Sequence, residues 1–190
     1  MFQRLFGRER QANRAITEAL YGEIVAAARQ PRFYSEWKVP DTPLGRFEML
    51  SLMMLVFQHR LHGEKGASPE IAQVLIDEFF KDVEHSLREL GISDVGVPKR
   101  MKKLARMYYG RTAAYADALD RDDQPALAAA LTRNVYPDAN GWPDPDGWLE
   151  SQHLAAYVMR VRQALASQAS EAICAGRISF PPASGDDNAA

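Results

Sequence analysis

The residues best suited to metal chemistry lie in the segment Asp82-Val83-Glu84-His85. On a helix, a carboxylate three residues before a histidine shares its face, which is the pairing found in di-iron helical bundles. Such bundles need two copies of this pair and two further carboxylates from other helices, and the sequence holds no second copy. We therefore expect a solvated acidic face and no metal site, with a metal-binding helical-bundle enzyme as the alternative hypothesis.

The remaining candidates for catalysis do not combine into a catalytic set. His59 and His62 fall near the expected end of a helix, where the helix dipole favours cations. Cys174 is the single cysteine, so it offers no internal disulfide and no multi-cysteine metal site, and no motif surrounds it. A glycine-rich phosphate loop and a G-x-S-x-G nucleophile motif are both missing from the sequence. We predict no catalytic residues, no cofactor and no enzymatic activity.

A run of cations is the strongest functional candidate. Residues 99–111 include six basic side chains and no acidic one. An exposed face of this kind attracts an anionic partner, which could be ribosomal RNA, an acidic membrane surface or an acidic protein. The alternative is that the cations pair with the acids of the preceding helix and form an inert interface. The expected basic face consists of Lys99, Arg100, Lys102, Lys103, Arg106 and Arg111.

The apolar periodicity predicts an all-α, single-domain bundle of about six helices with a long ordered loop before the last helix. Thr42-Pro43 (or Asp41) and Ser68-Pro69 are typical helix starts, and Gly91 is typical of a helix end. The segment 49–57 is apolar almost all round, which indicates a central helix. The expected helices cover residues 12–29, 43–62, 68–90, 98–119, 125–136 and 149–176, and the expected loop covers 134–148.

Composition sets the expected boundaries and compartment. We expect a flexible basic N-terminus at 1–11, a helical domain at 12–177 and a disordered tail at 178–190. The longest apolar run, 49–57, is short of the ~20 residues that span a bilayer, and the N-terminus has no signal-peptide core. The net charge of −2 gives no global footprint for DNA. These features predict a cytoplasmic protein, peripheral on a membrane at most.

Several motifs, in order and spacing, resemble the signature of the ubiquinol–cytochrome c reductase assembly chaperones. The resemblance covers roughly residues 33–136. It includes F-Y-x-x-W-x-V-P-D-T from Phe33, G-R-F-E-M from Gly45, D-E-F-F-K-D from Asp77 and L-R-E-L-G-I from Leu87. It continues with V-P-K-R-M from Val97, Y-G-R from Tyr109 and A-L-A-A-A-L-T-R-N from Ala126.

The resemblance implies a chaperone that binds newly made cytochrome b and promotes maturation of ubiquinol–cytochrome c reductase. It also implies a bacterial relative that acts on the inner face of the inner membrane, where the ribosome is a further candidate partner. Within the matched motifs we expect Trp37, Arg46 and Tyr109 to contact the client. We further expect client helices to lie near an apolar groove, with the basic face docked on the ribosome or on anionic lipid. An RNA- or ribosome-binding helical module is the second alternative.

Overall fold

The computed structural model describes residues 2–62, 64, 68–137 and 148–184, and the regular elements in these residues are all α-helices. Side chains are described from residue 13 onward, apart from Ser68. The all-α prediction is confirmed. The helices are α1 (Phe2–Ala28), α2 (Pro31–Ser35), α3 (Pro43–Leu61), α4 (Ser68–Glu89), α5 (Val97–Asp120), α6 (Gln124–Val135), α7 (Trp148–Ala166) and α8 (Ser170–Cys174).

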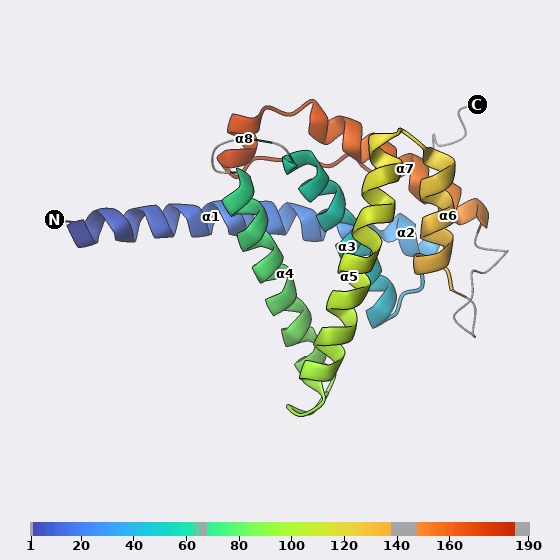
Figure 1. Ribbon diagram of the computed structural model, residues 1–190, viewed down its shortest axis with the longest axis horizontal. Coiled ribbons are helices and arrows are strands. Elements are labelled where there is room, and N and C mark those ends of the chain that lie inside the picture. Colours follow the sequence, from blue (N-terminus) through green and yellow to red (C-terminus); the bar gives the residue numbers. More distant parts are fainter. Residues whose placement is uncertain (1, 63, 65–67, 138–147, 185–190) are drawn as a thin grey trace.

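Helix α3 occupies the centre of the bundle, as its apolar circumference predicts (Figure 1). Residues 51–57 are all buried, and α3 packs against α1, α4, α5, α6 and α7. The helix begins where the sequence indicates, because Thr42 Oγ1 accepts a hydrogen bond from the Gly45 amide at 3.1 Å and Pro43 occupies the first turn. Asp41 is not the cap; it forms an ion pair with Arg46 at 2.7 Å.

Helices α4 and α5 form a hairpin whose turn lies at the lower end of Figure 1, beyond the lower end of α3. Gly91 has a φ of 77°, the left-handed conformation that glycine adopts without strain. The Ile92 amide then donates to the Leu87 carbonyl at 3.1 Å, which closes the end of α4. On the other side, the Val97 amide donates to the Ser93 carbonyl at 3.0 Å, so the turn is ordered by its own backbone.

The expected single helix at 149–176 is wrong, because the chain breaks into α7 and α8. Arg60, from the end of α3, donates to the Leu165 carbonyl at 2.9 Å and to the Gln168 carbonyl at 3.0 Å. The same guanidinium donates to Ser170 Oγ at 3.1 Å. One side chain thus satisfies carbonyls at the end of α7 and contacts the start of α8, which stabilises the break.

The two ends of the chain differ from the expected boundaries in the part that is described. Helix α1 begins at Phe2, whereas a start near residue 12 is expected. Within the expected tail, Ile178 is buried, the Pro181 carbonyl accepts from Tyr157 at 3.0 Å, and the Ala183 amide donates to Gln30 at 2.6 Å. Residues 178–184 therefore cover the junction of α1 and α7. Residues 185–190, and 138–147 of the expected ordered loop, lie outside the described residues.

The close approach of Gly45 to the Pro40 carbonyl at the start of α3 gives a prediction about stability. A Cβ on Gly45 would lie 1.9 Å from the Pro40 carbonyl oxygen, so Gly45→Ala must displace backbone and should lower the free energy of unfolding by about 3 kcal/mol. Gly22→Ala is the matched control, because a Cβ there meets nothing within 4 Å and should stabilise α1 by up to about 1 kcal/mol. Chemical denaturation measures both variants. Equal stability of the two variants would contradict the close-packing argument.

Candidate binding groove and its basic wall

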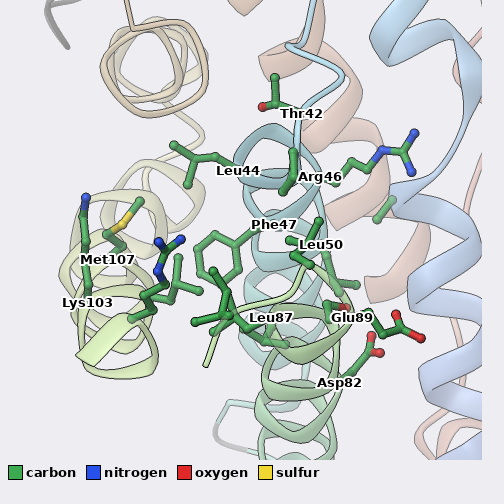
Figure 2. A pocket seen from close by; sticks show the side chains of 18 of the residues that line it. Thr42, Leu44, Arg46, Phe47, Leu50, Asp82, Leu87, Glu89, Lys103 and Met107 are labelled. Carbon is green, nitrogen blue, oxygen red and sulfur yellow. The ribbon is translucent and has the colours of Figure 1, made fainter. Parts of the chain in front are cut away.

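A groove with a volume of about 1370 Å³ lies between α3 and the α4–α5 hairpin, with the C-terminal end of α1 on its other side. Figure 2 shows Leu44, Phe47 and Leu50 of α3 opposite Lys103 and Met107 of α5. The hairpin determines where the groove lies. Side chains of α4 and α5 face the first turns of α3 and leave a space between them.

The floor of the groove is apolar and partly open to water. Leu44 is 46% exposed, whereas Phe47, one turn later, is 6% exposed. Leu87 from α4 and Met107 from α5 complete the floor, and both are half-buried. A contiguous apolar surface that a protein leaves uncovered is typical of a binding site for another protein or a membrane.

One wall of the groove carries the expected cations. Five of the six, all on α5, line it with exposed side chains: Lys99, Arg100, Lys102, Lys103 and Arg106. Within the described part of the chain, none of these five forms an ion pair. The acids of α4 bond elsewhere: Glu84 pairs with Arg88 at 2.8 Å, and Asp82 accepts from the Tyr21 hydroxyl at 2.9 Å. These side chains therefore do not form the inert α4–α5 interface of the alternative hypothesis.

Arg111 does not belong to this wall. Its side chain is 11% exposed, and its Nη2 lies 2.8 Å from Oε1 of Glu48, which is 3% exposed. Nε and Nη1 of Arg111 have no hydrogen-bond partner among the described residues. Loss of hydration raises the pKa of the Glu48 carboxyl to about 7, in spite of the nearby guanidinium. Arg111 is thus a structural residue that joins α5 to α3 inside the core.

The three expected client contacts lie in three different environments. Arg46 is exposed and lines the groove, next to Asp41. Trp37 is 4% exposed and packs in the core, with its ring centroid 5.4 Å from that of Phe33, so it does not face the groove. Tyr109 is 57% exposed on α5 but does not line the groove, because its ring lies beside Phe80 at 6.1 Å. The structure therefore places Arg46 in the same groove as the basic wall, on the opposite side from Lys103 in Figure 2, and places Trp37 and Tyr109 outside this groove.

The residues considered for metal binding make other contacts. Asp82 is hydrogen-bonded to Tyr21, and His85 lies 3.2 Å from Glu89 on the exposed face of α4. Over the residues with described side chains, no group of three or more histidine, cysteine, aspartate or glutamate residues is arranged to hold a metal ion.

Sequence reasoning expected an apolar groove but named no residues for its floor. The stripe on α4 that includes Leu75, Phe79, Val83, Leu87 and Leu90 has uniform helical spacing. Burial is lost along it toward the turn: Phe79 is 0% exposed, Val83 8% and Leu90 55%. The length of the stripe was the signal that could have revealed the exposed apolar side chains. The stripe continues beyond the part of α4 that α3 can cover.

The comparisons with known proteins agree with the motif resemblance. The family model described as ubiquinol-cytochrome C chaperone matches residues 35–180. The crystal structure of the Cbp3 homolog from Brucella abortus is 55% identical, covers 96% of this chain and 98% of that chain, and superposes with a TM-score of 0.83. No curated protein gives a significant match. The chain belongs to the ubiquinol-cytochrome C chaperone family, which consists of chaperones and not of enzymes.

The buried Arg111–Glu48 ion pair predicts that two cations of α5, Arg111 and Lys103, differ in their contribution to stability. Arg111→Ala leaves the Glu48 carboxylate buried without its partner and should lower the free energy of unfolding by about 3–5 kcal/mol at pH 8. Lys103→Ala, the matched control on the exposed wall, should leave the denaturation midpoint unchanged. Comparable losses for the two variants would contradict the division between a core arginine and an exposed wall.

The pKa of Glu48 predicts a pH dependence of stability. Because the folded pKa, about 7, exceeds the ordinary value of 4.5, the fold favours the protonated carboxyl. Its stabilising contribution is complete below pH 4.5 and is lost as the pH rises through 7. Glu48→Gln should therefore flatten the fall in melting temperature over this window, whereas Glu84→Gln, an exposed control, should not. A wild-type slope in Glu48→Gln would show that another group titrates.

Proposed function

We propose that this chain binds newly made cytochrome b in the groove and thereby promotes maturation of ubiquinol–cytochrome c reductase. Family membership supports the role of an assembly chaperone for this complex. We choose the groove as the client surface because its floor consists of apolar side chains that remain partly open to water. The proposed site of action is the cytoplasmic side of the inner membrane, where an unassembled membrane protein is accessible.

The dimensions of the groove suit a helical segment. An α-helix is about 10 Å wide, so a volume of about 1370 Å³ holds roughly three of its turns. A membrane protein that has not yet assembled exposes apolar helix faces, and covering one of them would prevent aggregation. The leucine, phenylalanine and methionine side chains of the floor provide an apolar surface that could cover such a helix. Methionine in particular adapts to varied partner shapes.

The basic wall gives the groove a direction. Cations line it from α5, whereas Asp82 and Glu89 line it from α4. In Figure 2 these acids lie on the side of the groove away from Lys103. A client segment with an acidic end would be attracted toward α5 and oriented by this asymmetry. Arg46, on α3, also lines the groove, but it pairs with Asp41 and lies on the side away from Lys103 in Figure 2.

Complementation of a strain that lacks the gene tests this function. Leu44→Asp places a charge on the floor and should reduce cytochrome b and ubiquinol–cytochrome c reductase activity in the membranes several-fold, because charged groups bind apolar surfaces poorly. Val74→Asp is the matched control, because Val74 is also 46% exposed but does not line the groove. Other respiratory complexes and the amount of the chaperone itself serve as internal standards.

Selective loss in the deletion strain, restored by the wild-type gene and by Val74→Asp but not by Leu44→Asp, supports the proposal. Full restoration by Leu44→Asp would reject the groove as the client site. Normal reductase in the deletion strain would reject the function itself.

A further inference from the structure

The turn of the α4–α5 hairpin lies at a projecting end of the molecule (Figure 1). Apolar side chains at this end are exposed. Val95 is 90% exposed and Leu90 is 55% exposed, the first being the most exposed of the large apolar side chains described. This exposure is fixed by the fold, because the turn is closed by backbone hydrogen bonds on both sides. The Gly96 amide donates to the Ser93 carbonyl at 2.8 Å, which holds Val95 at the outer point of the turn.

Cations outnumber acids in the segment that forms this apolar tip. Residues 84–106 contain six lysines and arginines against three acids. The three acids pair with neighbouring residues. Arg88 forms ion pairs with both Glu84 and Asp94, and Glu89 lies 3.2 Å from His85. Lys99 and Arg100, in the first turn of α5, are exposed and form no ion pair with a described residue.

An exposed apolar tip with unpaired cations beside it is the arrangement of a peripheral membrane anchor. Apolar side chains enter the boundary between headgroups and acyl chains, while lysine and arginine bind the phosphates. RNA would bind the cations but would gain nothing from Val95, and a protein client fits the concave groove better than a convex tip. None of the described helices has the length and hydropathy of a bilayer-spanning segment.

We propose that the tip of the α4–α5 hairpin docks on an anionic membrane surface, with Val95 and Leu90 at the headgroup boundary and Lys99 and Arg100 on lipid phosphates. The groove then opens beside the bilayer, because its cationic wall begins at the same end of α5. Of these four residues, Leu90, Lys99 and Arg100 also line the groove, whereas Val95 does not. Val95 is therefore the position at which docking is tested apart from client binding.

Vesicle flotation of the full-length protein tests the docking. Vesicles of phosphatidylcholine alone are compared with an equal mixture of phosphatidylcholine and phosphatidylglycerol. We expect binding to the anionic vesicles only, weakened by added salt because the attraction is screened. Val95→Asp should weaken this binding about tenfold, and Lys99→Ala about fivefold. Val74→Asp is again the control, because it makes the same change at an exposed valine of α4, away from the turn, and should bind as the wild type does.

A second variant separates the apolar contact from charge. Val95→Ser removes the apolar side chain without adding an anion, and it should also weaken vesicle binding. Wild-type binding by Val95→Ser would overturn the proposal, because the cations alone would then account for the attraction. Retention on a single-stranded RNA oligonucleotide without retention on anionic vesicles would also overturn it. Reductase activity in the complemented strain reports separately on the groove, so failure of one proposal is distinguishable from failure of the other.

Discussion

The burial of helix α3 is the constraint on which the rest of the structure depends. Its residues from 51 to 57 are all buried, so neighbouring helices must cover this part of α3 on every side. Gly45 permits the chain that precedes α3 to pass close to its first turn, and Arg60 at the other end holds the break between α7 and α8. Over the first turns of α3 the cover is incomplete, because α4 and α5 continue toward their own turn. The groove lies over this part of the helix.

The same hairpin therefore sets both surfaces that we assign to partners. Its inner side supplies the wall over Leu44 and Phe47, and its turn supplies the exposed Val95. The cations of α5 lie between the two, which links the proposed client-binding groove to the proposed membrane-docking tip. A chaperone for a membrane protein needs both features, because its client has to be shielded from water and kept at the bilayer. Membership in the ubiquinol-cytochrome C chaperone family is consistent with this proposed arrangement.

The sequence predicted the helices well because their signals are local. The Thr42-Pro43 start, the Gly91 end and the apolar spacing each act within a few residues. It could not predict the break after α7, which depends on Arg60, more than a hundred residues earlier. It placed Arg111 on the exposed face, although Arg111 follows buried Tyr108 by three residues and so lies near the buried stripe. Periodicity shows which side chains are apolar, but only the packing shows which of them remain uncovered.

Site-specific photo-crosslinking during synthesis of cytochrome b tests the central claim most directly. A photoreactive residue replaces Leu44 on the groove floor or, as control, Val74, which has the same exposed fraction. Newly made cytochrome b is labelled, and its crosslinked adducts are isolated. Our account predicts an adduct of labelled cytochrome b from position 44 and none from position 74. Equal adducts at the two positions, or none at position 44 in a strain that assembles ubiquinol–cytochrome c reductase normally, would contradict it.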